Sequence, residues 1–424
     1  MKPDISTLSN DLKILTTSIK KIESVTLTVW VNVGSRYEDE SKAGISHFLE
    51  HIVFKGGKKY NSAKKISEAI DSIGGEFNAS TGKEITLFYI KVRADKIEKA
   101  FDVLSDMLLS PLLKPSDIER EKGVIKAEMD MYEDLPIRRV EEFLENIVFE
   151  GNSLARDIIG TKKAIDGISA KDFKNYLEKY YFSQNMLITL SGSIEESKAL
   201  KLSEKYFGSI KRGVKNPPVK FVSSQKAPKI KMVNKKTDQA HIMIGFLGER
   251  LGHKNRYAEA VLNAILGGGM SSRMFTEVRE KRGLAYAVKT YSDHYTDTGR
   301  FTAYAGVEPN KAEDALKIML KVFEDLKNEK IKITAKELAK AKEYIKGKIS
   351  LALEDTSAIN QFFGEEELLL GKIKSLEEIF EKIDKVKKEE LLELANNFFS
   401  KERLNLAIIG PFKNKAGFDR IISN

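Results

Sequence analysis

The segment Tyr180–Ile194, YYFSQNMLITLSGSI, returns in altered form near the end of the chain as Asn397–Phe412, NFFSKERLNLAIIGPF. Both stretches combine the end of a helix, a Phe-Ser pair and an apolar strand that closes on glycine. A repeat of this kind at long spacing indicates that two similar structural units follow one another along the chain. We therefore expect the 424 residues to form two homologous domains.

Further pairs of segments repeat in the same order and define the fold class. In each half an alternating strand is followed by a helix that ends in a glycine cluster, and then by two more strands and several helices. Strands joined by hairpin-scale loops, with long helices between and after them, predict the α+β class, each domain being an antiparallel sheet backed by helices. The paired segments are Val25–Val33 with His241–Leu247, Gly56–Gly57 with Gly267–Gly269, Phe77–Thr81 with Tyr286–Tyr291, and Ile85–Val92 with Phe301–Val307.

A linker is expected between the two domains. Residues 211–229, KRGVKNPPVKFVSSQKAPK, contain three of the nine prolines and show no helical or strand period. Such composition is typical of a connecting segment. We expect an N-terminal domain at residues 1–212, a linker at 213–229 and a C-terminal domain at 230–424.

Composition excludes several classes of function. The chain has no cysteine, which rules out disulfides, a thiol nucleophile, thiolate-bound zinc and iron–sulfur clusters. The net charge of +9 comes from lysines that alternate with glutamates, so we expect no nucleic-acid partner. No apolar run approaches the roughly 18 residues of a membrane span, so no membrane insertion is expected. Residues 1–15 resemble neither a signal peptide nor a transit peptide, which predicts a cytoplasmic location.

One motif carries most of the chemistry in this sequence. Residues 44–54 read GISHFLEHIVF, and on a helix His47 and His51 project from one face, one turn apart. Two neutral imidazoles at this spacing suit zinc, and Glu50 shares their face. Two histidines without a metal are the alternative. The remaining histidines, His241, His253 and His294, are interpreted as structural.

A third zinc ligand must be histidine or carboxylate. The predicted helix at residues 118–131 places Glu121 and Glu128 seven apart on one face. With 76 residues between His51 and Glu128, the chain resembles the inverted-zincin metallopeptidases, the family of pitrilysin, insulin-degrading enzyme and the mitochondrial processing peptidase. The resemblance implies one Zn²⁺ per chain on His47, His51 and Glu128, with Glu50 as general base. It also implies that Glu121 supports the ligands, although an exposed helix acid is the alternative.

The second half is expected to lack a zinc site. Aligned on the glycine clusters, it places Glu259, Leu262 and Asn263 opposite the residues of the zinc motif. It does contain Arg279 and Tyr286, seven apart, and the resemblance implies that such a pair reaches the scissile carbonyl and the substrate backbone. An ordinary helix arginine and a core tyrosine are the alternative.

The resemblance also suggests where a peptide substrate binds. Residues 77–81, FNAST, resemble the family's edge strand, to which an extended peptide adds, and Asn78 and Ala79 are the candidate contacts. An ordinary strand is the alternative. Glu133 and Asp134 are expected to favour basic, presequence-like peptides, unless they form only a solvated helix end.

Together these features predict a zinc-dependent endopeptidase that acts on peptides or flexible segments. The resemblance implies two domains that face each other as a clamshell around a chamber, and because this chain carries both the zinc residues and the Arg/Tyr pair, a homodimer is expected. A non-catalytic structural or partner subunit of the same fold is the main alternative. A peptide-binding module without turnover is a further one.

Overall fold

The computed structural model describes residues 1–423, in which the chain forms two compact units. The first unit comprises Met1–Met129, Arg156–Val219 and Ser350–Leu376, and the second comprises Asp130–Ala155, Lys220–Ile349 and the residues from Glu377 onward. The units are therefore not two contiguous halves of the sequence. Each takes a helical segment from the other half. The connecting residues 211–228 form no helix or strand.

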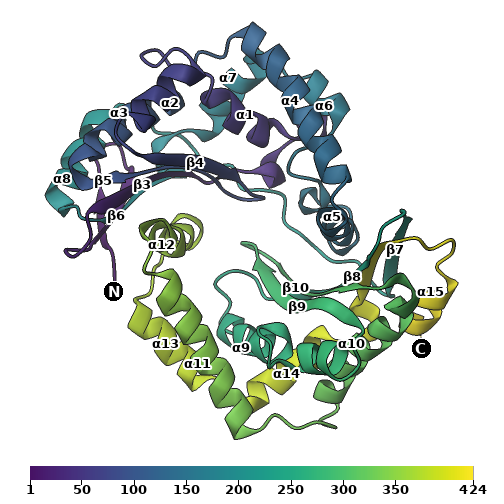
Figure 1. Ribbon diagram of the computed structural model, residues 1–424. Coiled ribbons are helices and arrows are strands. Elements are labelled where there is room, and N and C mark those ends of the chain that lie inside the picture. The colour runs from purple at the N-terminus through teal and green to yellow at the C-terminus, as the bar shows by residue number, and fades with distance from the viewer. Residues whose placement is uncertain (424) are drawn as a thin grey trace. The chain divides into compact units, whose positions relative to one another are not determined.

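The first unit is built on a six-stranded sheet with the order β1-β2-β6-β3-β5-β4 (Figure 1). All neighbouring strands are antiparallel except β2 and β6, which run parallel. The strands are β1 (Asp4–Thr7), β2 (Lys13–Ser18), β3 (Ser24–Val31), β4 (Glu76–Thr81), β5 (Thr86–Arg93) and β6 (Met186–Gly192).

Helices cover both faces of this first sheet. Figure 1 shows α1, α2, α3 and α7 on one face and α12 on the other, and α12 contacts β3 and β6. The helices assigned wholly or mainly to this unit are α1 (Ile45–Val53), α2 (Ala63–Asp71), α3 (Ile97–Leu109), α4 (Pro115–Glu133), α6 (Lys162–Asp166), α7 (Ala170–Tyr180), α8 (Glu196–Phe207) and α12 (Thr356–Leu370).

The second unit contains a five-stranded sheet with the order β7-β11-β8-β10-β9. Its strands are antiparallel except for the parallel pair β7 and β11. The strands are β7 (Lys229–Asn234), β8 (Ala240–Gly248), β9 (Ala285–His294), β10 (Gly299–Val307) and β11 (Asn405–Gly410).

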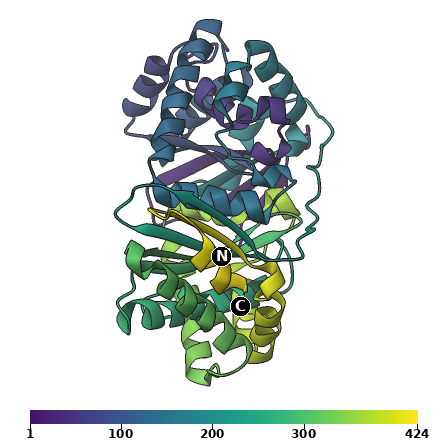
Figure 2. The same ribbon diagram turned by 90° about the vertical axis from the view of Figure 1, so that its right-hand side faces the viewer.

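Helices also cover both faces of the second sheet. Helix α5 packs on β8 and β11 on one face of the sheet, and α9, α10 and α14 lie on the other face (Figure 1). Figure 2 shows the same elements after a rotation of 90°. Across residues 1–423, no helix is both long and apolar enough to cross a membrane. The helices are α5 (Pro136–Val148), α9 (Arg256–Gly267), α10 (Ala312–Lys327), α11 (Ala335–Ala352), α13 (Leu376–Lys385), α14 (Lys388–Phe398) and α15 (Ala416–Ser423).

The internal repeat and the α+β class predicted from the sequence are confirmed. Strands β2-β6-β3-β5-β4 of the first unit have the same order and directions as β7-β11-β8-β10-β9 of the second, and β1 is an addition. The sheets differ from the expected purely antiparallel form because each has one parallel pair. A parallel partner requires a long crossover, which the helices between β2 and β6 and between β7 and β11 provide.

Helix α12 docks on the first sheet through a buried polar network. The sequence of β3, SVTLTVWV, alternates threonine with apolar residues, and every residue after Ser24 is buried. Asn360 of α12 donates from Nδ2 to the Thr26 carbonyl at 2.9 Å and to the Thr28 hydroxyl at 3.0 Å. Its Oδ1 accepts from Ser191 Oγ of β6 at 2.6 Å. The threonine face of the sheet is therefore satisfied by a helix that lies more than 300 residues later in the chain.

Asn360→Leu is expected to destabilise the protein by about 2–4 kcal/mol, because it leaves several buried donors and acceptors without partners. The measurement is urea unfolding followed by circular dichroism. Gln361→Leu is the matched control, since Gln361 is exposed on the same helix. Equal midpoints for the two variants would show that the network does not hold α12 in place.

Candidate functional site

Helix α1 carries three of the predicted site residues and begins at a glycine that its geometry requires. Gly44 has φ 95°, and a Cβ there would lie 2.4 Å from the Ile159 carbonyl oxygen. The buried carboxylate of Glu38 accepts from the backbone N–H of Gly44 at 2.7 Å and of Ser46 at 2.8 Å. Glu38 thus caps the helix, although burial raises its pKa to about 7.

His47, His51 and Glu128 converge at one point in the first unit. Their ligand atoms lie within 4.8 Å of one another. The Nε2 atoms of His47 and His51 stand 3.8 and 3.5 Å from Glu128 Oε2. In a tetrahedral zinc site with Zn–N of about 2.0–2.1 Å, ligand atoms are separated by about 3.3 Å. The three residues therefore fit one zinc ion with only small adjustments.

The charge state of His47 also suits a metal. The pKa of His47 is lowered to about 4, mainly because the imidazole is buried and to a smaller extent because His51 lies beside it. A neutral imidazole at neutral pH has a lone pair available for coordination, and no proton must leave before a metal binds. Within the described part of the chain, the buried Nδ1 of His47 has no hydrogen-bond partner.

Glu121 lies behind His51 and contacts its imidazole. Its Oε1 is 3.0 Å from His51 Nδ1, and its Oε2 is 2.6 Å from Lys55 Nζ. The residue is only 3% exposed, which excludes an exposed helix acid. Burial alone would raise its pKa, but hydrogen bonds from His51 and Lys55 hold the pKa of Glu121 below its usual range. An ionised Glu121 fixes the His51 tautomer and directs Nε2 toward the cluster.

Glu50 shares α1 with the two histidines and is held by the neighbouring strand β4. Thr81 Oγ1 donates to Glu50 Oε2 at 2.5 Å. Burial raises the pKa of Glu50, and the Thr81 hydrogen bond partly opposes that shift. A carboxylate with a raised pKa is a better proton acceptor than an exposed one.

Strand β4 is an edge strand, as predicted. It pairs only with β5, in a register that sets Asn78 opposite Tyr89 and Ala79 opposite Phe88. The backbone N–H of Ala79 donates to Asn78 Oδ1 at 2.9 Å. The Asn78 side chain therefore satisfies a backbone donor of the edge strand.

Arg279 and Tyr286 lie next to each other in the second unit. Arg279 belongs to a short π-helical turn, Phe275–Glu280, and its guanidinium carbon is 5.4 Å from the centre of the Tyr286 ring. Tyr286 is 75% exposed on β9, which excludes the core tyrosine considered from the sequence. The structure thus groups the two residues on the surface of their unit.

The acids at the end of α4 are less available than their sequence suggested. Glu133 forms an ion pair with Arg139 at 2.9 Å, and Asp134 lies 3.4 Å from Lys235 Nζ. These neighbouring cations reduce the negative charge that the two acids would present to a basic peptide.

The other three histidines have structural partners. His241 contacts the Tyr304 hydroxyl through Nδ1, His253 pairs with the Glu249 carboxylate, and His294 contacts the Glu249 carbonyl. Within residues 1–423, His47, His51 and Glu128 form the one cluster suited to a metal.

Sequence reasoning missed three residues that position the site. Glu38 caps α1, Lys55 neutralises Glu121, and Thr81 holds Glu50. Of the three, only Thr81 lies in a segment singled out from the sequence, the candidate peptide-binding strand at residues 77–81. None of the three belongs to a recognisable motif. Their roles depend on contacts between elements that are distant in sequence.

Two family models match this chain, one in each half of the sequence. The family described as "Insulinase (Peptidase family M16)" matches residues 13–162, and "Peptidase M16 inactive domain" matches residues 167–345. A relative from Bacillus subtilis, named uncharacterized zinc protease YmxG, is 37% identical over 96% of this chain and 98% of its own length. A Streptomyces coelicolor protein, also named an uncharacterized zinc protease, is 34% identical over 97% of this chain and 90% of its own length.

Solved structures share the fold over nearly the whole chain. A protease from Helicobacter pylori superposes with a TM-score of 0.90 at 26% identity, covering 97% of this chain and 99% of its own. A chain from complex III2 of Candida albicans gives a TM-score of 0.84 at 23% identity, with 99% of both chains covered. At that identity the second likeness concerns the fold alone.

Glu121→Ala is expected to weaken zinc binding by about 10–100-fold, because His51 loses the partner that orients its imidazole. Competition with a chromophoric chelator measures the affinity. The control is Glu119→Ala, which removes a 69% exposed carboxylate from the same helix. Unchanged zinc affinity in Glu121→Ala would remove Glu121 from the site.

Proposed function

Since the chain belongs to the insulinase (M16) family of peptidases, we propose that it is a zinc-dependent endopeptidase that cleaves peptides or flexible protein segments. The observation that carries this proposal is the convergence of His47, His51 and Glu128, with Glu50 one helical turn from His47. His47, His51 and Glu128 would hold one Zn²⁺ per chain. The relatives from Bacillus subtilis and Streptomyces coelicolor, both named zinc proteases, support the choice of metal.

In the proposed peptide hydrolysis, Glu50 transfers a proton and Thr81 orients Glu50. Zinc, when bound, supplies a Lewis acid that polarises a carbonyl and makes water more acidic. Glu50 accepts the proton of the attacking water at its carboxylate and passes it to the nitrogen of the leaving amine. The raised pKa of Glu50 suits this exchange, and Thr81 keeps the carboxylate in one orientation.

The edge strand β4 offers a binding mode for an extended substrate. A peptide that pairs with the outer edge of β4 would receive backbone hydrogen bonds and would be recognised with little regard to its side chains. In this proposal the Asn78 side chain leaves the Ala79 N–H, which then donates to the substrate carbonyl. Asn78 and Ala79 therefore act in substrate binding.

Arg279 and Tyr286 are the residues of the second unit that we propose take part in catalysis. Both carry donors that suit the oxyanion formed when water adds to a peptide carbonyl. Their exposure and mutual contact support a shared role.

Three further properties belong to the same proposal. Substrates would include basic, presequence-like segments, the enzyme would act as a homodimer, and its location would be cytoplasmic. The presence of both the His47 cluster and the Arg279–Tyr286 pair in one chain favours a homodimer over a pair of unlike subunits.

One observation favours the alternative of a non-catalytic subunit. The second half matches a family description that contains the word "inactive". That match, however, covers residues 167–345 and includes none of His47, Glu50, His51 and Glu128. A scaffold has no need of these four side chains together, so we place the peptidase first.

Glu50→Gln is expected to lower kcat for cleavage of a flexible peptide by at least about 10²–10⁴-fold, because the amide cannot accept a proton. Zinc content should stay at one per chain, since Glu50 is not among the three converging ligand residues. Peptide digestion followed by mass spectrometry gives the rate and the cleavage positions, and metal analysis of the same samples gives the zinc content.

His47→Ala is the companion variant and should lose both zinc and cleavage. Full activity in Glu50→Gln would refute the role of Glu50 as base. A wild-type protein that binds zinc and peptide without cleaving it would identify a binding module, and one that binds no zinc would identify a structural subunit.

Arg279→Ala and Tyr286→Phe are each expected to lower kcat by about 10-fold or more with zinc retained, because each removes a donor to the developing oxyanion. The measurement is steady-state kinetics on the same peptide. Glu280→Ala, an exposed neighbour on the π-helical turn, is the control. Wild-type kinetics in both variants would leave the second unit without a catalytic contribution.

A further inference from the structure

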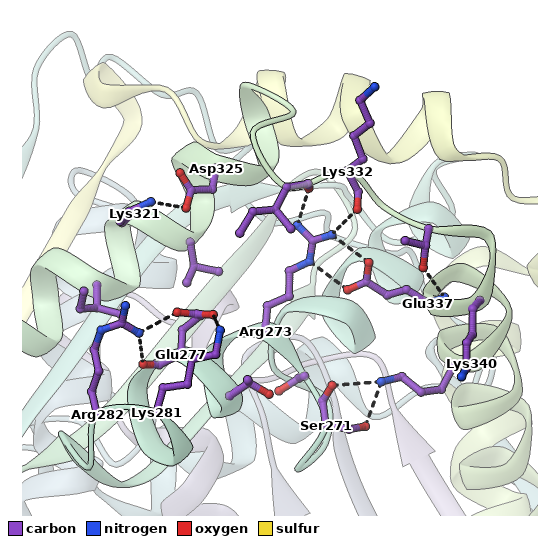
Figure 3. A pocket seen from close by; sticks show the side chains of 17 residues that line it. Ser271, Arg273, Glu277, Lys281, Arg282, Lys321, Asp325, Lys332, Glu337 and Lys340 are labelled. Atoms are coloured by element: carbon purple, nitrogen blue, oxygen red, sulfur yellow. Dashed lines mark hydrogen bonds and ion pairs between the residues drawn. The ribbon is translucent and has the colours of Figure 1, made fainter.

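A pocket in the second unit is separate from the residues proposed for catalysis. It has a volume of about 620 Å³, within the range of small-molecule sites. Its walls come from residues 271–282, from α10, from the segment before α11 and from the first turns of α11 (Figure 3). Neither Arg279 nor Tyr286 lines it.

The lining carries more positive than negative charge. Three carboxylates line the pocket, and each already pairs with a cation of the lining: Glu337 with Arg273, Glu277 with both Lys281 and Arg282, and Asp325 with Lys321 (Figure 3). The lining cations are Arg273, Lys281, Arg282, Lys321, Lys332, Lys336 and Lys340. Several positive charges are therefore not neutralised by the acids present.

Two positions show this excess most clearly. Glu277 lies 2.6 Å from both Lys281 Nζ and Arg282 Nη1, so one carboxylate faces two cations. Lys340 Nζ donates to the carbonyl and the hydroxyl of Ser271, each at 3.0 Å, and no carboxylate contacts it among residues 1–423. An anion that entered the pocket would meet cations that its own lining leaves partly uncompensated.

The pocket is held in shape by Arg273, which is largely buried. Its Nε and Nη2 bind both oxygens of Glu337 at 2.9 and 2.8 Å. Its Nη1 donates to the Ile331 carbonyl at 3.0 Å and Nη2 to the Lys332 carbonyl at 3.3 Å. One guanidinium thus fixes the start of α11 and the loop before it, which reduces the ordering cost of binding a ligand.

One side of the pocket is apolar. Ile318 and Val322 are four residues apart on one face of α10, and Ile331, which is 49% exposed, belongs to the loop after that helix. A small inorganic anion would leave this wall in contact with water. An anion that carries an acyl chain or an aromatic ring would cover it.

From these features we propose that the pocket binds an amphipathic organic anion, with its charged group attracted by the cationic lining, in which Lys281 and Lys340 stand on different sides (Figure 3), and its apolar part against Ile318, Val322 and Ile331. A carboxylate, a sulfonate and a phosphate ester share the required charge. This site does not depend on the proposed peptidase activity, because none of its residues takes part in that chemistry.

The test uses the full chain and two probes, 1-anilinonaphthalene-8-sulfonate and octanoate. Fluorescence titration gives the affinity for the sulfonate, and octanoate should displace it. Lys281→Gln/Lys340→Gln should weaken both ligands at least about tenfold, since the pocket loses two positive charges. Glu277 keeps Arg282 as its partner in this variant, so the fold should persist, and the thermal midpoint checks this.

Lys226→Gln/Lys236→Gln is the matched control, because it removes two exposed lysines of the same unit that do not line the pocket. Ile331→Ser should weaken octanoate but not inorganic phosphate. Equal affinities in the pocket and control variants would overturn the proposal. So would displacement of the probe by octanol as readily as by octanoate, or by phosphate alone as readily as by octanoate.

Discussion

The hydrogen bond between His51 and Glu121 is the contact on which the arrangement of the candidate site depends. It joins α1 to α4 across 70 residues of sequence and brings Glu128, two turns further along α4, to the imidazoles. A carboxylate as buried as Glu121 is costly unless it is paired. His51 and Lys55 together supply that pairing, so the same contact that orients a ligand also permits a charge to be buried.

The repeated fold could be predicted because its signals are local. Alternating strands such as Val25–Val33, glycine-terminated helices and their order along the chain indicate each sheet without reference to the other. The exchange of α5 and α12 between the two halves could not be predicted in this way. Asn360 recognises Thr26 and Thr28 through hydrogen bonds across more than 300 residues, and neither sequence segment reveals its partner.

In the candidate site, too, some residues could be predicted from the sequence and others could not. His47, Glu50 and His51 follow from the spacing of three side chains on one helix, and Glu128 and Glu121 followed from the resemblance to a family. The residues that hold these side chains were not predictable, because Glu38 reaches α1 from a preceding loop and Thr81 reaches Glu50 from β4. Helical spacing identifies reactive groups, whereas their orientation is set by tertiary contacts.

Helix α9 of the second unit is the counterpart of α1. Comparing the residues at equivalent positions shows which side chains the fold requires and which it does not. Glu259, which aligns with His47, is fully buried, and it accepts a hydrogen bond from the Glu249 backbone N–H at 3.0 Å. Asn263, which aligns with His51, accepts from the Thr290 hydroxyl of β9 through its side-chain Oδ1 and, at 3.0 Å, through its backbone carbonyl. The second unit thus builds the same strand order with ordinary hydrogen bonds at these positions. A histidine pair and a converging glutamate are not required by the fold, and this supports their assignment to chemistry in the first unit.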